Sequence, residues 1–181
     1  MTAVVYPQWL LDIVAPGQIY PSDAAIMRRA IDLTLAALDR GQGGPFGAII
    51  ATEAGEIAAV AHNEVRQELD VTAHAEVMAI RRAAQALRRL DLDAADGVPL
   101  RLFTTCEPCA MCVGAMFWAR LPTVIAAARK EDAQAAGMRQ EFALPTAAFF
   151  AREHITYRPD LLREEALEIF REFARLRETR A

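Results

Sequence analysis

The sequence predicts an α/β layered domain built on a mixed sheet. Segments with helical periodicity alternate along the 181 residues with short apolar runs that are typical of strands. The first two of these runs, 46–51 and 57–61, are separated by a turn that contains Gly55, which indicates an antiparallel hairpin. Later strands are linked through helices, so we expect parallel and antiparallel pairs in one sheet. The length suits a single domain over residues 1–181.

The elements before the hairpin are an arm and a helix. Residues 1–20 carry prolines and a glycine and predict an irregular arm that packs on the body through Trp9 and Leu10. Ser22 is a suitable N-cap for the helix that follows, and Gly41 ends its helical repeat.

The elements after the hairpin follow from the same periodicities. The segment 130–144 is polar and mixed and predicts no element. The helix at 161–178 has an apolar stripe that we interpret as a core contact rather than a partner groove. In order, the sequence predicts a loop at 63–70, a helix at 73–89 capped by Thr72, a strand at 100–104, a helix that starts at Pro108 and runs to 119, a strand at 124–128, a short helix at 146–151, a strand at 155–157 and the helix at 161–178.

Composition narrows the function classes. The chain has 24 acidic and 20 basic residues and a formal net charge of −4, which argues against a nucleic-acid-binding surface. No apolar run is long enough to span a bilayer, and residues 1–5 do not resemble a signal peptide. We therefore expect a cytoplasmic protein without membrane contact. Three cysteines, Cys106, Cys109 and Cys112, lie within seven residues, a pattern that in a reducing compartment indicates metal binding or catalysis.

Two short segments carry the chemistry. His74, Ala75 and Glu76 form an H-x-E motif, and Cys109 and Cys112 belong to a P-C-x-x-C motif. This combination matches the known signature of zinc-dependent nucleobase deaminases.

The residue types explain the signature. Zinc accepts imidazole and thiolate ligands, and the three-residue spacing of Cys109 and Cys112 places both sulfurs on one side of a helical turn. With His74 as third ligand, the fourth position stays open for a water that zinc acidifies. Glu76, two residues beyond His74, is suited to carry protons between this water and a substrate.

Other readings of the motif remain open. Cys106 also has C-x-x-C spacing to Cys109, so a purely structural zinc site with four protein ligands is an alternative. We interpret Cys106 as a buried, inert thiol, because it lies at the end of a strand and because Glu76 would have no function beside a purely structural zinc site. A zinc module used only for binding is a further alternative.

Over residues 24–142 the chain resembles the cytidine deaminase-like superfamily, and within it the bacterial guanine deaminases. This resemblance implies a three-layer α/β/α fold with a five-stranded mixed sheet, a homodimer, and zinc-dependent conversion of free guanine to xanthine and ammonia. The residues that carry it are Gly43 to Ala48, Asn63, Thr72 to Val77, Cys106 to Cys109, Met111, Cys112, Gly114, Ala115, Trp118 to Arg120, Asp132, Ala133, Ala136 and Gly137.

The resemblance also assigns substrate contacts. Asn63 would bond the polar edge of the ring, the backbone N–H of Ala75 would help to hold the base, and Phe46 and Trp118 would wall its faces. The alternatives are a turn role for Asn63 and core packing for both aromatic residues. His62 and His154 are interpreted as ordinary surface or satisfied histidines.

The chain departs from guanine deaminases at two places. Gln140 stands where the family has an acid, and Glu141 would replace that acid by a shift of one residue. Near Thr179 the chain also lacks the aromatic residue that closes a neighbour's pocket in the family. Alternative substrates are therefore an ammeline-type aminotriazine or cytosine, and a tRNA adenosine deaminase is a second alternative.

Overall fold

The computed structural model describes residues 4–93, 97–138 and 145–179. None of the helices in these ranges is both long and apolar enough to cross a membrane. In chain order the elements are α1 (Gln8–Leu11), α2 (Asp23–Asp39), β1 (Gly47–Thr52), β2 (Ile57–His62), α3 (Val65–Glu68), α4 (Ala75–Leu87), β3 (Leu100–Cys106), α5 (Ala110–Trp118), β4 (Thr123–Ala128), α6 (Lys130–Ala135), α7 (Thr146–Arg152), β5 (Thr156–Arg158) and α8 (Arg163–Glu178).

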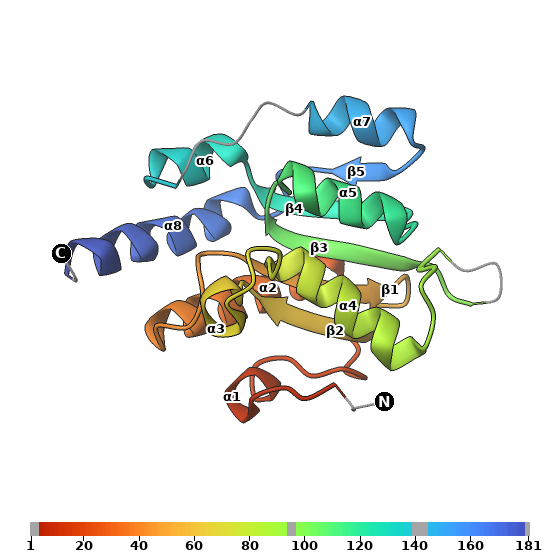
Figure 1. Cartoon of the computed structure of the whole chain (residues 1–181), viewed down its shortest axis with the longest axis horizontal. Coiled ribbons are helices and arrows are strands. Elements are labelled where there is room, and N and C mark those ends of the chain that lie inside the picture. Colours follow the sequence, from red (N-terminus) through yellow and green to blue (C-terminus); the bar gives the residue numbers. More distant parts are fainter. Residues whose placement is uncertain (1–3, 94–96, 139–144, 180–181) are drawn as a thin grey trace.

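The five strands form one mixed sheet in the order β2-β1-β3-β4-β5 (Figure 1). The β1–β2 hairpin and the β1–β3 pair are antiparallel, whereas β3–β4 and β4–β5 are parallel. Both parallel pairs are joined through helices, as crossover connections require. The predicted five-stranded mixed sheet is therefore confirmed.

Helices cover both faces of this sheet, and the alternation of side chains along the strands decides which face each residue serves. In β1, Ile49 and Ala51 pack in the cluster that contains α2 and α8, while Ala48 and Ile50 pack in the cluster that contains α4 and α5. Gly47 lets β1 approach α2, because a Cβ there would lie 2.1 Å from Oγ1 of Thr34. The result is the predicted three-layer arrangement (Figure 1).

The arm packs as expected but is not wholly irregular. It contains the short helix α1, and Leu10 is fully buried. The arm then runs along the hairpin, where the N–H of Gly17 donates to the carbonyl of Ile57 and the N–H of Ile57 donates to that of Gln18, each at 2.8 Å. The ring of Trp9 lies 5.5 Å from that of His62, so the arm reaches the end of β2.

One predicted helix start is confirmed, and another differs from the prediction. Ser22 caps α2 as expected, accepting from the N–H of Ala25 at 3.2 Å. Thr72 does not cap α4, because its N–H and its hydroxyl both donate to Oδ1 of Asp70, and α4 begins only at Ala75. Such local bonds from short polar side chains compete with helix formation.

The remaining differences are shifts at loops and helix ends. The segment 63–70 contains the one-turn helix α3, and α5 begins at Ala110, so Pro108 precedes the helix instead of opening it. The segment 130–144, which gave no clear pattern, begins with α6. The delayed starts of α4 and α5 make His74 and Cys109 the residues at the two N-caps.

Candidate active site

Two helix N-termini bring the predicted metal ligands together. His74 and Cys109 occupy the N-caps of α4 and α5, and Cys112 lies in the first turn of α5. Both helices pack on the same face of the sheet, in one apolar cluster. His74 and Cys109, which are 35 positions apart in the chain, therefore lie next to each other.

The three ligand atoms have the spacing that zinc requires. Nδ1 of His74 lies 3.5 Å from Sγ of Cys109 and 3.6 Å from Sγ of Cys112, and the two sulfurs are 3.5 Å apart. Tetrahedral zinc, with bonds of about 2.0 Å to nitrogen and about 2.3 Å to sulfur, holds such atoms roughly 3.6–3.8 Å apart. Among the described residues these three form the group able to hold a metal ion.

The thiols differ in acidity before a metal binds. The hydrogen bond between the two sulfurs lowers the pKa of Cys109 to about 4 and raises that of Cys112, which is also buried. The metal-free pair thus carries one negative charge and one proton. A metal ion takes the place of that proton, because thiolates are the ligating form.

Glu76 lies directly beside the three ligands. It is buried in the first turn of α4, and its carboxyl group contacts the Cys112 thiol. Burial, followed by the charge of the Cys109 sulfur, raises the pKa of Glu76 above its usual range. The carboxyl group stands next to the ligands without being one of them.

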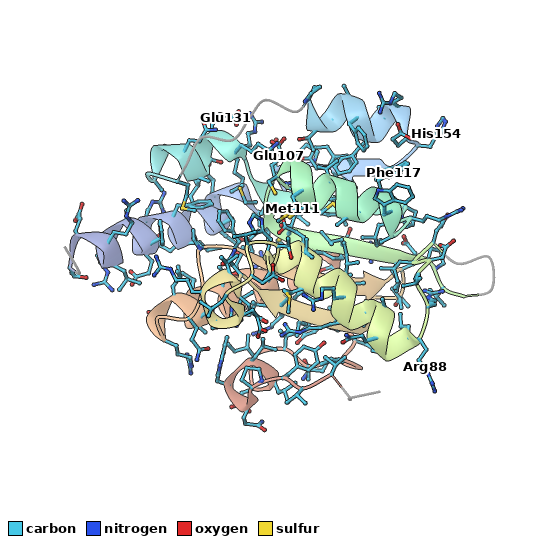
Figure 2. The ribbon with its side chains drawn as sticks, in the orientation of Figure 1. Arg88, Glu107, Met111, Phe117, Glu131 and His154 are labelled. Carbon is cyan, nitrogen blue, oxygen red and sulfur yellow. The ribbon has the colours of Figure 1, made fainter. Side chains whose placement is uncertain are left out.

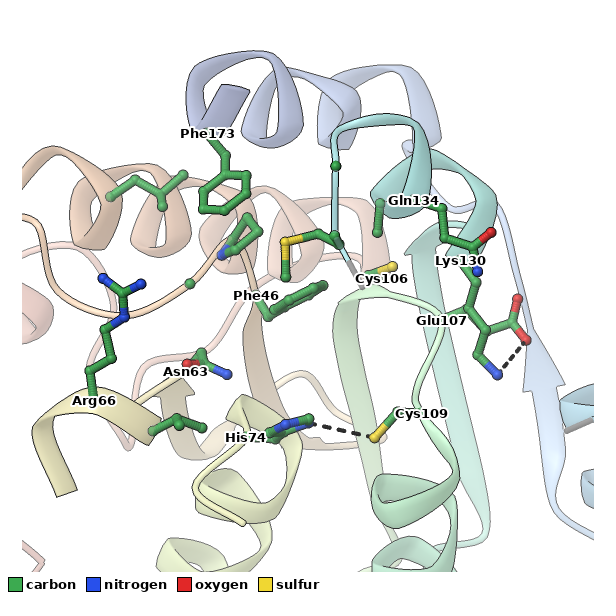
Figure 3. A pocket seen from close by; sticks show the side chains of 18 of the residues that line it. Phe46, Asn63, Arg66, His74, Cys106, Glu107, Cys109, Lys130, Gln134 and Phe173 are labelled. Carbon is green, nitrogen blue, oxygen red and sulfur yellow. Dashed lines mark hydrogen bonds and ion pairs between the residues drawn. The ribbon is translucent and has the colours of Figure 1, made fainter. Parts of the chain in front are cut away.

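A cavity of about 1030 Å³ opens over the ligands. His74 and Cys109 bound it on one side, and Phe46 and Asn63 extend toward it from the strand edge (Figure 3). The N–H of Asn63 donates to the carbonyl of Phe46 at 2.9 Å. No hydrogen bond joins the side-chain amide of Asn63 to another described residue, so it remains available to a molecule in the cavity.

The other predicted substrate contacts fall in three different places. The N–H of Ala75 is in the first turn of α4, where N–H groups have no acceptor within the helix. Trp118 ends α5, is 82% exposed and does not line the cavity. A nine-residue helix spans about 13 Å, so its last residue is too far from the ligands at its start. Gln140 and Glu141 lie outside the described residues.

Several cavity residues were not predicted from the sequence. Lys130 directly follows the residue after β4, and its ammonium group lies 3.5 Å from Glu107 and donates to the hydroxyl of Thr146 at 2.9 Å. Phe173 and Leu176 of α8 also line the cavity. The position of Lys130 after a parallel strand was the available signal, because ligands collect at the carboxyl ends of such strands.

The third cysteine has a different role from the other two. Cys106 is buried at the end of β3, and its thiol donates to the carbonyl of Arg129 at 3.4 Å. It does not belong to the group that could hold a metal. Among the described residues the candidate site thus offers three ligands, whereas the purely structural alternative needs four.

Comparison with known proteins agrees with this geometry. Residues 21–128 match the model of the cytidine and deoxycytidylate deaminase zinc-binding region. The prediction of zinc as the cofactor is thereby confirmed, and His74, Cys109 and Cys112 form a possible site for it.

Individual relatives extend the match. The guanine deaminase of Bacillus subtilis is 45% identical over 116 residues, which cover 64% of this chain and 70% of that protein. A tRNA-specific adenosine deaminase of Agrobacterium fabrum is 35% identical over 137 residues, 72% of this chain and 80% of that one. The solved structure of guanine deaminase from Nitrosomonas europaea superposes with a TM-score of 0.86 at 29% identity and covers 97% of both chains.

Proposed function

The chain belongs to the cytidine and deoxycytidylate deaminase zinc-binding family, and from this premise we propose that it deaminates free guanine to xanthine and ammonia. The observation that carries the proposal is the likeness to guanine deaminases, which extends over 97% of the chain in the Nitrosomonas europaea structure. We further propose that residues 1–181 act as one deaminase domain. A reducing cytoplasm suits this site, because it keeps the cysteines as thiols for the metal.

The reaction requires a nucleophile and a proton carrier. When bound, zinc supplies a Lewis acid that makes water more acidic and more nucleophilic. Glu76 removes a proton from the attacking water and delivers it to ring N3 as the C2–O bond forms. The Glu76 carboxylate then takes the proton of the new C2 hydroxyl and transfers it to the exocyclic nitrogen, so that the C2=O double bond forms as the C2–N bond breaks. Ammonia leaves, and the ring remains as xanthine.

The substrate contacts follow from the cavity. Asn63 presents a side-chain amide that can both donate and accept, as the edge of a purine requires. The N–H of Ala75 lies at the positive end of the α4 dipole and can donate to a ring oxygen. Phe46 offers a flat apolar wall for the face of the base.

The likeness to tRNA adenosine deaminases supports a second candidate. Such an enzyme needs cationic side chains available to phosphates. On α8, however, Arg171 pairs with Glu168 and Arg175 pairs with Glu172, which neutralises both cations. The net charge of −4 also disfavours binding of the tRNA phosphates. A free base is therefore the better substrate for this surface.

A panel of amino-substituted rings tests the proposal. We expect ammonia release from guanine to exceed that from adenine, cytosine and ammeline by at least about 100-fold in kcat/KM, because buried polar groups reject rings that leave them unpaired. The measurement is coupled ammonia detection with zinc-loaded protein. Turnover of another ring with silence toward guanine would reject guanine as the substrate. A salt-sensitive gel shift with tRNA would instead favour the second candidate.

We also propose that the protein is a homodimer through the exposed face of α5. Trp118 and Phe117 are the last two residues of this helix and are 82% and 38% exposed. The side chain of Phe117 is labelled in Figure 2. A Cβ at Gly114 on the same helix would meet nothing within 4 Å, so a second copy could approach closely. Large apolar side chains grouped at a surface are typical of contact sites.

Charge at this face should separate the subunits. We expect Trp118→Glu to shift the protein from the mass of two chains to that of one in analytical ultracentrifugation, because it places a carboxylate in an apolar contact. Val5→Glu, at an equally exposed apolar position on the arm, should leave the mass unchanged. A parent protein with the mass of one chain, or a dimeric Trp118→Glu, contradicts the proposed interface.

A further inference from the structure

A buried polar group adjoins Asn63, and none of its members is among the residues that line the cavity. It consists of His62, Glu64 and Arg82, whose side chains are 5%, 8% and 11% exposed. The guanidinium of Arg82 binds both carboxylate oxygens of Glu64 at 2.8 Å and also donates to the carbonyl of Val60 at 3.1 Å. Burying an ion pair is costly and adds little stability by itself, so its presence here calls for another explanation.

His62 connects this group to Asn63. Nδ1 of His62 lies 3.0 Å from the carbonyl oxygen of Asn63. A carbonyl can only accept, so Nδ1 carries the proton and donates. Burial lowers the pKa of His62, which keeps the ring neutral. Nε2 is then without a proton, and its 3.7 Å separation from Glu64 is too long for a hydrogen bond.

The backbone of Asn63 is thus held on both sides. Its N–H donates to Phe46 and its carbonyl accepts from His62. Gly43 packs against the same carbonyl so closely that a Cβ there would lie 2.0 Å from the oxygen. Behind His62, the ring of Trp9 lies at 5.5 Å, and the ring of Tyr6 covers Arg82 at 5.1 Å. With its backbone fixed, Asn63 can direct only its side chain, and that side chain faces the cavity (Figure 3).

We propose that His62 is a positioning residue for base recognition, which fixes the direction of the Asn63 amide by donating from Nδ1 to the Asn63 carbonyl. The inference rests on the proposed contact between Asn63 and the substrate. The proposal also assigns a function to the buried ion pair. Arg82 neutralises the charge of Glu64 and holds this carboxylate against β2, next to the neutral ring of His62. His62 is not among the residues that line the cavity, so the proposed effect on the base passes through Asn63.

Substitutions of His62 test the direction of this hydrogen bond. His62→Leu should lower kcat/KM for guanine about tenfold or more, mostly through KM, because a misdirected amide binds the base poorly. In His62→Asn the amide nitrogen takes the place of Nδ1, and activity should return to within about threefold of the parent. In His62→Gln the donor lies near the Nε2 position instead, so little should be recovered. Equal activity of the asparagine and glutamine variants would overturn the inference.

A double-mutant cycle separates positioning from general stability. If His62 acts through Asn63, His62→Leu should change kcat/KM less than about twofold once Asn63→Ala is present, because the coupled losses do not add. Val60→Ala, a buried change in the same strand, controls for stability and should leave kcat/KM of the parent nearly unchanged. The same fold-loss from His62→Leu in both backgrounds overturns the positioning role.

A spectroscopic measurement does not depend on turnover. The chain has three histidines, so the ¹⁵N resonances of the His62 ring can be assigned by comparison with His62→Asn. We expect a protonated Nδ1 and an unprotonated Nε2 at neutral pH. The opposite tautomer overturns the inference even if guanine is the substrate. If Asn63→Ala were as active as the parent, Asn63 would not contact the base and the inference would fail. If the parent did not deaminate guanine, the proposed substrate would be rejected as well.

Discussion

Replacement of Glu76 by glutamine should lower kcat for the deamination about 10³-fold while the protein keeps one zinc per chain. General acid–base groups contribute roughly 10²–10⁴-fold, and Glu76 serves several proton transfers in the proposed reaction. Glutamine has nearly the same shape, and the atoms that could bind zinc belong to His74, Cys109 and Cys112. The checks are ammonia release at saturating substrate and zinc content by atomic emission.

A matched change keeps this test specific. Glu68→Gln, on the exposed surface of α3, removes one carboxylate from a nearby helix and should leave kcat unchanged. If Glu76→Gln retained the turnover of the parent, Glu76 would not be the proton carrier. If the parent itself released no ammonia from any base, the alternative of a zinc module used only for binding would replace the enzymatic proposal.

Loss of one thiolate should remove the metal. Cys112→Ser leaves two strong ligands at a buried site, and we expect zinc content to fall from one per chain to less than about 0.2, since a hydroxyl is a poor zinc ligand. The melting temperature should fall as well, because metal binding to the folded state contributes to its stability. Metal analysis after dialysis and thermal unfolding measure both effects.

Cys106→Ser is the matched control, because the three cysteines lie within seven residues. Its hydroxyl can still donate to the carbonyl of Arg129, as the thiol does. We therefore expect full zinc content and unchanged turnover. Zinc loss in Cys106→Ser equal to that in Cys112→Ser would mean that the site uses all three cysteines and that no position is left for water.

The fold was largely predictable because its elements depend on local patterns. The hairpin, the alternation along β1 and the helical repeats of α2 and α8 are properties of short segments, and the structure contains each of them. The predictions were wrong at helix starts, because a few side-chain hydrogen bonds determine the residue at which a helix begins. Thr72 donates two hydrogen bonds to Asp70, and the N-cap of α4 is therefore His74. The periodicity of apolar residues could not indicate this shift.

The metal-binding part of the site was easier to predict from the sequence than the wall of the cavity. The three residues that could hold zinc belong to motifs with fixed spacing, so the sequence alone could single them out as candidates. The wall of the cavity comes from segments far apart in the chain, such as Lys130 after β4 and Phe173 on α8, and no local pattern joins them. The contact that the resemblance assigned to Trp118 stays a prediction, since Trp118 is exposed at the end of α5 and does not line the cavity.

The position of α8 has a consequence for synthesis on the ribosome. Its buried residues Ile169 and Phe170 complete the core on the α2 face of the sheet, although β4, the strand that they cover, ends at Ala128. The intervening 50 residues (178 − 128) take roughly 3–10 s to translate. During that interval Phe103 and Ile125 lack their final cover. The nascent chain should therefore bind chaperones more through this face than through the face beneath the metal ligands, where α4 and α5 have already emerged and Phe150 and Ile155 are still to follow.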